Sequence, residues 1–212
     1  MLVEYDHALA AQLAERFRDE PRVTVVDGDI LGIDLVEVLG AAPAWKVVAN
    51  LPYNISSPVL FRLLENRALF TRMVLMLQKE VAERLVASAG CSDYGVTTAL
   101  LGLWFDMRRE FIVPPACFSP RPKVDSAVVS FMPLTQPRVE VGSEDMFRRV
   151  VKGAFAMRRK TLSNCLKAAQ LTAPEDIGSV LDSCGINGQR RGETLSLEEF
   201  ASLSRCLSGM KA

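Results

Sequence analysis

The segment NLPYNISSPVLF, residues 50–61, joins the signal of a strand to the signal of a helix. It follows WKVVA, residues 45–49, an apolar run that we expect to form a buried strand. Pro58 suits the first turn of the helix that follows, where its missing N–H group does no harm. The chain therefore places an amide, a proline and an aromatic residue together at the carboxyl end of a strand. Open α/β sheets bind their ligands at such strand ends.

Strand and helix signals alternate on both sides of this segment. Strands are expected at residues 2–4, 22–26, 45–49, 73–77, 108–113 and 126–131, the fourth of them buried on both faces. Helices are expected after a cap at Asp6, with Leu9, Leu13 and Phe17 on one face, and at residues 34–39, 56–64, 78–87 and 96–104. This order predicts an α/β sheet with an antiparallel addition at one edge.

The pattern changes after Met132. The segment PLTQPRVEVGSED, residues 133–145, has the composition of a linker. Helical segments are expected after it, at residues 146–156, 159–169, 174–184 and 197–207. We therefore expect two domains, a sheet domain over residues 1–135 and a small all-helical domain over residues 136–212.

The net charge is zero, but the charges are unevenly distributed. Residues 1–40 contain nine acidic and three basic residues, whereas residues 144–167 contain seven basic and two acidic residues. The basic C-terminal region indicates a polyanionic partner such as nucleic acid, although a solvated helix face has the same composition.

The composition excludes several classes of protein. The 212 residues contain no run of 18 apolar residues, and their start has no basic leader, so neither a membrane span nor a signal peptide is expected. Five scattered cysteines without a C-x-x-C pair, and a single histidine, His7, argue against a zinc site and for reduced thiols in the cytoplasm. The lone histidine also argues against a hydrolase with a nucleophile beside a base.

Polar side chains stand at three successive strand ends. Glu4 ends the first expected strand, Asp29 follows the second, and Asn50 follows the third. In a parallel sheet these three ends face one crevice, where an acid can bind the hydroxyl pair of a ribose. A second acid can accept a hydrogen bond from the exocyclic amine of adenine. Each acid alone is equally compatible with a helix cap or a solvated turn.

The NLPY sequence suits chemistry at the amino group of a nucleobase. Such an amine is a poor nucleophile because its lone pair is delocalised into the ring. The Asn50 side-chain oxygen and the backbone carbonyl held by Pro52 can accept its two N–H hydrogen bonds, which draws the nitrogen toward tetrahedral geometry. Tyr53 can stack on the base and hold it out of its helix. A loop with an Asn turn and a buried tyrosine is the structural alternative.

Four motifs in this order resemble the small-subunit ribosomal RNA adenine dimethyltransferases, the enzymes whose loss gives bacteria resistance to the antibiotic kasugamycin. They are NLPYNISSPVLF at residues 50–61, LQKEVAERL at 77–85, FSPRPKVDSAVV at 118–129 and AFAMRRKTLSNCL at 154–166. The resemblance extends over nearly the whole chain. The large-subunit methyltransferases of macrolide resistance share NLPY-like loops, but the KVDSAVV and RRKTL segments are more similar to the small-subunit group.

The resemblance implies a class I, Rossmann-like methyltransferase sheet that uses S-adenosylmethionine, with a small C-terminal all-helical domain. It implies transfer of methyl groups to N6 of two adjacent adenosines near the 3′ end of small-subunit rRNA, two per base, during ribosome biogenesis. The partner would be the immature small ribosomal subunit. We expect a cytoplasmic monomer without a metal.

The same resemblance implies three groups of site residues. The cofactor-binding residues are Glu4 toward the ribose, Asp29 toward the adenine amine, Ile30 and Asn50. The catalytic residues are Asn50, Leu51, Pro52 and Tyr53, with Phe118 packing on the target base. RNA contacts are expected from Arg158, Arg159 and Lys160 on a basic helix, and from Arg121 and Lys123 in the Pro-rich loop. Such basic residues give affinity that depends on salt and is largely blind to sequence.

One part of the family pattern is missing. The family's cofactor fingerprint is a glycine-rich loop after its first strand, and the thirteen glycines of this chain nowhere form G-x-G. The resemblance begins at the family's second strand, so we expect a fragment or an internal Met as the start, a gap in the sheet, and weak cofactor binding. A non-catalytic rRNA-binding or assembly factor is the alternative, but the intact Glu4, Asp29, Asn50 and Tyr53 favour the enzyme.

Overall fold

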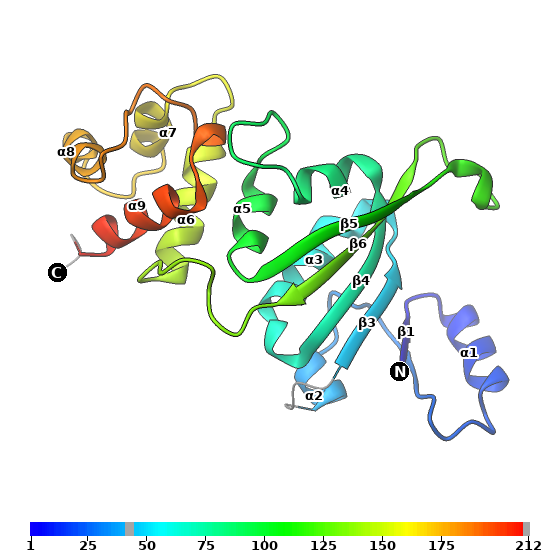
Figure 1. Ribbon diagram of the computed structural model, residues 1–212. Coiled ribbons are helices and arrows are strands. Elements are labelled where there is room, and N and C mark those ends of the chain that lie inside the picture. The colour runs from blue at the N-terminus through cyan, green and yellow to red at the C-terminus, as the bar shows by residue number, and fades with distance from the viewer. Residues whose placement is uncertain (41–44, 210–212) are drawn as a thin grey trace.

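The strands form two sheets in the computed structural model, which describes residues 1–40 and 45–209 (Figure 1). A two-stranded parallel sheet pairs β1 (Leu2–Glu4) with β2 (Val25–Asp27). A four-stranded sheet has the order β3-β4-β6-β5 and consists of β3 (Trp45–Asn50), β4 (Phe70–Gln78), β5 (Phe105–Val113) and β6 (Ser126–Pro133). β3 and β4 are parallel, whereas β6 is antiparallel to both of its neighbours. The expected antiparallel addition is therefore confirmed.

The helices expected from the sequence are present, with ends moved by a few residues. The N-terminal part contains α1 (His7–Arg16), α2 (Leu35–Leu39), α3 (Ser56–Glu65), α4 (Lys79–Leu85) and α5 (Val96–Gly102). The C-terminal part contains α6 (Glu144–Phe155), α7 (Leu162–Ala168), α8 (Asp176–Ser183) and α9 (Leu197–Gly209). Short 3-10 turns lie at η1 (Tyr53–Ile55), η2 (Arg67–Leu69), η3 (Pro115–Cys117) and η4 (Gly192–Thr194). Asp6 caps α1 as expected, because its carboxylate accepts hydrogen bonds from first-turn N–H groups.

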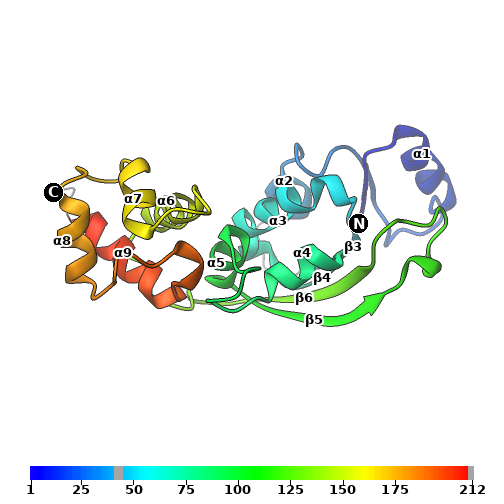
Figure 2. The ribbon, with the colours of Figure 1, turned by 90° about the horizontal axis from the view of Figure 1, so that it is seen from above.

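Helices cover one face of the four-stranded sheet. Figure 2 shows α2, α3 and α4 on the same side of its strands. Side chains of β4 and β6 alternate between the two faces, as the period of two in a strand requires. The inward set is fully buried and packs against α3, α4 and α5; it contains Met73, Leu75, Leu77, Ala127, Val129 and Phe131.

Two expectations about burial are wrong. β3 is not a buried strand, because every second side chain is exposed and Val48 is 83% exposed. β4 buries Met73, Leu75 and Leu77 fully but leaves the side chains between them only partly covered. The physical reason is that helices cover a single face of this sheet and that β3 is its edge strand. An apolar composition does not say how many faces of a strand are covered.

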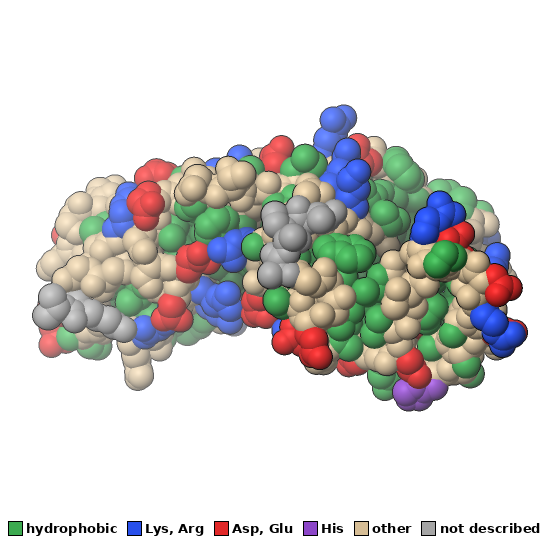
Figure 3. Space-filling model, turned by 90° about the horizontal axis from the view of Figure 1, so that it is seen from below, with side chains coloured by type: hydrophobic (Ala, Val, Ile, Leu, Met, Phe, Trp, Pro, Cys, Tyr) green, Lys and Arg blue, Asp and Glu red, His purple; other side chains and the backbone are tan. Residues whose placement is uncertain are grey.

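The elements β1, α1 and β2 form a small unit beside β3, at the end of an elongated molecule opposite the C-terminal helices (Figures 1 and 2). The two-stranded sheet is not hydrogen-bonded to β3, so the gap expected in the sheet is present. On the apolar face of α1, Leu9 is exposed and Leu13 and Phe17 are half-buried, and Ala10 is the buried residue of the helix. Figure 3 shows hydrophobic side chains on the surface of the half that carries the histidine. The exposed large hydrophobic residues of β3 and the described segments before it are Tyr5, Leu9, Val36 and Val48.

The helices α6 to α9 pack around a second core. Its largest fully buried side chains are Phe147, Leu162, Leu166 and Phe200. This core also includes residues of α5 and the loop before it, so the two cores meet along α5. The boundary between residues 135 and 136 stays a prediction, and residues 210–212 of the expected helical domain lie outside the described residues.

The basic triplet Arg158, Arg159 and Lys160 does not lie on a helix, contrary to expectation. It forms an exposed turn between α6 and α7. The next residue, Thr161, caps α7, because its hydroxyl accepts a hydrogen bond from the Asn164 N–H group (3.4 Å). A helix therefore starts after the triplet instead of running through it.

Candidate functional site

The NLPY loop lies at the carboxyl end of β3. Asn50 is the exposed last residue of that strand, and the N–H group of Leu51 continues the pairing by donating to the Met76 carbonyl (3.1 Å). The Pro52 carbonyl accepts hydrogen bonds from the Ser56 hydroxyl (3.1 Å) and from the backbone of η1. Because the Pro52 carbonyl is used within the loop, the Leu51 carbonyl, on the peptide bond to Pro52, is the candidate for the backbone acceptor expected beside the Asn50 amide.

Tyr53 anchors this loop to the neighbouring motifs. Its hydroxyl lies 2.7 Å from the hydroxyl oxygen of Ser126, the fully buried first residue of β6. Ser126 pairs in register with Gln78, the last residue of β4. The next residue, Lys79, donates its N–H to the Asp125 carbonyl (3.0 Å) and places its ammonium 3.7 Å from the Asp125 carboxylate. The NLPY, LQKE and KVDS segments therefore meet at one end of the sheet.

The two acids lie at the carboxyl ends of β1 and β2. The Glu4 carbonyl accepts a hydrogen bond from the Gly28 N–H group (2.9 Å), which holds the turn that contains Asp29 beside the end of β1. Each carboxylate uses one oxygen locally: Glu4 Oε1 accepts from the Asp6 N–H group and Asp29 Oδ1 from the Leu31 N–H group, both at 2.9 Å. Within the described residues, the other oxygen of each carboxylate accepts no hydrogen bond.

The Asp29 turn is connected to the helix that follows the NLPY loop. Ile30 packs against the core of the four-stranded sheet, and the Ile33 carbonyl accepts a hydrogen bond from the Arg62 guanidinium of α3 (2.6 Å). Glu4 and Asn50 nevertheless belong to different sheets. The predicted cofactor-binding and catalytic residues therefore form two groups, one at the end of each sheet. Residues 29–33 connect the two groups.

One further charged pair lies near the end of β2. His7 Nδ1 is 2.7 Å from the Asp27 carboxylate. This hydrogen bond, followed by the charge of Asp27, raises the pKa of His7 above its ordinary value. Both side chains are exposed, so the pair links α1 to β2 at the surface and salt screens it.

The loop between β5 and β6 carries three of the predicted residues. Phe118 is half-buried, and Arg121 and Lys123 are exposed. Lys123 lines a cavity of about 400 Å³ together with Lys79 and Asp125. This loop therefore reaches the same end of β4 and β6 as the NLPY anchor.

Within residues 1–40 and 45–209, no cluster of three or more His, Cys, Asp or Glu side chains is arranged to hold a metal ion. In that part of the chain, every helix is too short or too polar to span a membrane.

Comparison with known proteins gives matches along almost the whole chain. A family model described as "Ribosomal RNA adenine dimethylase" matches residues 1–206. The chain is 60% identical over 208 residues to Ribosomal RNA small subunit methyltransferase A of Geobacter sulfurreducens, which covers 97% of this chain and 75% of that protein. A protein of the same name from Clostridium acetobutylicum is 39% identical over 202 residues, with 95% and 73% covered.

Solved structures have the same fold. A dimethyladenosine transferase from Plasmodium falciparum superimposes with a TM-score of 0.76 at 27% identity, covering 95% of this chain and 78% of that one. The 23S rRNA methyltransferase ErmE superimposes with a TM-score of 0.68 at 23% identity, covering 97% and 80%, and shows the fold alone. The expected methyltransferase sheet with a helical C-terminal region is therefore confirmed. With a family model that matches 206 of its residues and a relative at 60% identity, the chain belongs to the ribosomal RNA adenine dimethylase family.

Proposed function

We propose that this chain transfers methyl groups from S-adenosylmethionine to N6 of two adjacent adenosines near the 3′ end of small-subunit rRNA, on the immature small ribosomal subunit. The observation that carries the proposal is the meeting of the NLPY, LQKE and KVDS segments at one end of the sheet. Relatives named as small-subunit methyltransferases favour this enzyme over the non-catalytic assembly factor. The proposal includes a cytoplasmic monomer.

The residues of the NLPY loop prepare the acceptor nitrogen of the target base. The Asn50 amide oxygen and the Leu51 carbonyl accept the two N–H groups of the adenine amine, which turns its lone pair toward the methyl donor. The Tyr53 ring, fixed through its hydroxyl to Ser126, stacks on the base, and Phe118 packs on it from the β5–β6 loop. Positioning of this kind supplies much of the rate enhancement when the donor is already reactive.

The strand-end residues fit the nucleoside half of S-adenosylmethionine. Glu4 and Asp29 each keep a carboxylate oxygen outside their turn hydrogen bonds, which suits the ribose hydroxyls and the adenine amine. Ile30 offers an apolar side chain beside Asp29. When bound, the cofactor supplies an electrophilic methyl group. The sequence has no glycine-rich loop for the methionine half, so we expect the 212 residues alone to bind the cofactor weakly.

The test of this function is methyl transfer from labelled S-adenosylmethionine to undermethylated small ribosomal subunits. It uses the 212-residue chain and a version extended by the glycine-rich segment of its family. Asn50→Ala in the active version should lower the methylation rate roughly 10²-fold or more, the loss typical of a polar contact made in the transition state. Binding to the subunit should change little.

Asn54→Ala is the matched control, because Asn54 is an exposed amide in the same loop, four residues further along. It should leave the rate near that of the parent chain. Equal rates for the Asn50 and Asn54 variants would remove Asn50 from the mechanism, and an extended chain without any methyl transfer would contradict the proposed function.

A further inference from the structure

Two of the five cysteines meet in the helical C-terminal part of the molecule. Cys184 lies at the C-terminal end of α8, and Cys206 lies in the second half of α9. Both are free thiols, and their sulfur atoms are 3.1 Å apart. The two residues are 22 positions apart in the chain, so their spacing in the sequence does not reveal the contact. The packing of α8 against α9 creates it.

The end of α8 holds the backbone of Cys184 in place. Gly185 follows it with a φ of +67°, a left-handed conformation that favours glycine. The Gly185 N–H group donates to the Asp182 carbonyl (3.0 Å), and the Ile186 N–H group donates to the Leu181 carbonyl (2.9 Å). These two hydrogen bonds form a Schellman motif, and Ile186 is buried in the second core. Cys184 is therefore fixed between a regular helix and a buried side chain.

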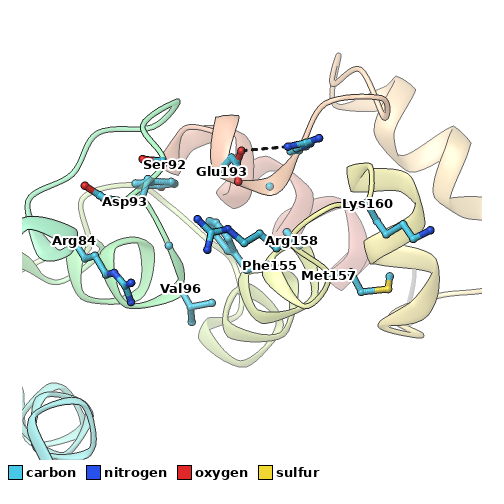
Figure 4. A pocket seen from close by; sticks show the side chains of 14 residues that line it. Arg84, Ser92, Asp93, Val96, Phe155, Met157, Arg158, Lys160 and Glu193 are labelled. Atoms are coloured by element: carbon cyan, nitrogen blue, oxygen red, sulfur yellow. Dashed lines mark ion pairs between the residues drawn. The ribbon is translucent and has the colours of Figure 1, made fainter. Parts of the chain in front are cut away.

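The helix that carries Cys206 is anchored in the same core. The Phe200 ring of α9 lies 5.9 Å from the Phe155 ring of α6, and Leu207 is also buried. The turn η4, which precedes α9, lies against α6, where Phe155 and Glu193 line one cavity of about 260 Å³ (Figure 4). Packing therefore holds Cys206 opposite the end of α8.

The two sulfur atoms are placed to form a bond with each other. An S–S bond is about 2.05 Å long, so the sulfurs need to approach by only about 1 Å, which a small rotation of the side chains supplies. Both cysteines are half-buried, so a small oxidant can reach them. Burial raises the pKa of the Cys184 thiol, so at neutral pH this sulfur is mostly thiol and reacts slowly. The pair differs from the exposed Cys91 and Cys117 because each of its sulfurs has a second thiol beside it.

We propose that Cys184 and Cys206 are a modification site, at which hydrogen peroxide forms a reversible disulfide that joins α8 to α9. One sulfur attacks a peroxide oxygen; an S–O bond forms, the O–O bond breaks, and water leaves, which gives a sulfenic acid. The second sulfur then attacks the first; the S–S bond forms, the S–O bond breaks, and the hydroxide leaves as water with the proton of the second thiol. The sulfurs lose two electrons, and these reduce one peroxide to two waters. A thiol reductant reverses the step by exchange.

The disulfide stabilises the helical part only under oxidising conditions. It closes a loop over residues 185–205, which restricts the unfolded chain and so favours the folded one. In a reducing cytoplasm the two thiols stay apart as thiols, because cytoplasmic disulfides are transient. The pair is therefore a site that responds to peroxide and recovers afterwards, whereas a single oxidised thiol proceeds toward acids that reductants do not restore.

The experiment treats the 212-residue chain with hydrogen peroxide in a background of Cys91→Ser and Cys117→Ser, which removes the exposed thiols. Mass spectrometry of the oxidised monomer should show the loss of two hydrogen atoms, and digestion without reductant should yield the Cys184 peptide linked to the Cys206 peptide. The midpoint of thermal unfolding, followed by circular dichroism, should rise by about 5 °C or more. Dithiothreitol should reverse both the mass change and the rise.

Single replacements test the pairing. Cys184→Ser and Cys206→Ser should each gain oxygen in place of losing hydrogen, and peroxide should not raise their unfolding midpoints. Cys165→Ala is the matched control, because Cys165 is a buried cysteine of the same helical part and should leave the cross-link intact. Oxygen gained on both thiols of the parent, a disulfide between two copies of the chain, or an unchanged midpoint after cross-linking would overturn the inference. None of these results bears on methyl transfer, which the Asn50→Ala assay tests.

Discussion

Tyr53 shows how much of the candidate site can be predicted residue by residue. The sequence predicts a stacking role for its ring, because an aromatic residue after Asn-x-Pro at a strand end is visible there, and that role stays a prediction. Its anchor was not predictable, because Ser126 lies 73 residues away and is a small residue in the apolar run SAVVSF. Lys79 and Asp125 were missed for the same reason: their contact depends on the register of β4 and β6.

Tyr94 carries a prediction about pH. Burial, followed by the nearby charge of Glu199, raises its pKa from 10.0 to about 12. A phenol whose pKa is raised by folding stabilises the protein below the unfolded pKa, and this contribution is lost as the pH rises through the folded pKa. Between these two pH values, the free energy of unfolding of the wild type should fall faster than that of Tyr94→Phe. Urea denaturation of both proteins over that pH range measures this free energy.

The control for this prediction is Tyr5→Phe, because Tyr5 is largely exposed. That variant should follow the wild-type pH dependence. A Tyr94→Phe curve that runs parallel to the wild type would show that ionisation of Tyr94 is not coupled to folding.

At the scale of elements, the sequence predicted which segments form strands and helices better than it predicted their surroundings. The periods of two and of 3.6 residues are local properties, so β3 and α3 were recognised from residues 45–64 alone. The exposure of Val48 depends on which elements lie beside β3, and that information is not local. The turn at residues 158–160 was missed because Met, Arg and Lys favour helices, while the cap formed by Thr161 decides where α7 begins.

Two glycines test the packing of η4 against α6. A Cβ atom at Gly192 would meet the Ala154 backbone at 2.5 Å, so Gly192→Ala should lower the free energy of unfolding by about 1–3 kcal/mol, the cost of overpacking. The matched control is Gly178→Ala in α8, where nothing lies within 4 Å. That change should raise stability by about 0.5–1 kcal/mol, since Ala is the better helix former.

Urea denaturation measures the free energy of unfolding of both variants. Equal stability of Gly192→Ala and the wild type would mean that η4 moves away from α6 at little cost in free energy. A loss of stability in Gly178→Ala would show that α8 has a neighbour that the structure does not reveal.

At the scale of the whole molecule, the parts of the fold differ in how much buried core supports them. The four-stranded sheet and the C-terminal helices each have a buried core, and these cores meet along α5. The unit of β1, α1 and β2 has two strands of three residues and one buried side chain in its helix. Two short strands without further pairing are marginal in water. The acids proposed to bind the cofactor, Glu4 and Asp29, therefore lie on or next to the least supported part of the fold.

Hydrogen exchange should reveal this difference directly. Backbone amides of residues 2–27 should exchange through local opening, at a free energy well below that of global unfolding, whereas amides of β4 and β6 should exchange only when the molecule unfolds. Ala10→Gly should speed exchange in residues 2–27 alone, because Gly costs a helix about 1 kcal/mol and Ala10 is the buried residue of α1. Ala82→Gly, at a fully buried position of α4, should instead speed exchange in the four-stranded sheet. Two results would contradict this prediction: protection of residues 2–27 as strong as that of β4, or an Ala10→Gly effect that spreads to β4. Either result would mean that the N-terminal unit unfolds together with the four-stranded sheet, although β2 and β3 are not paired.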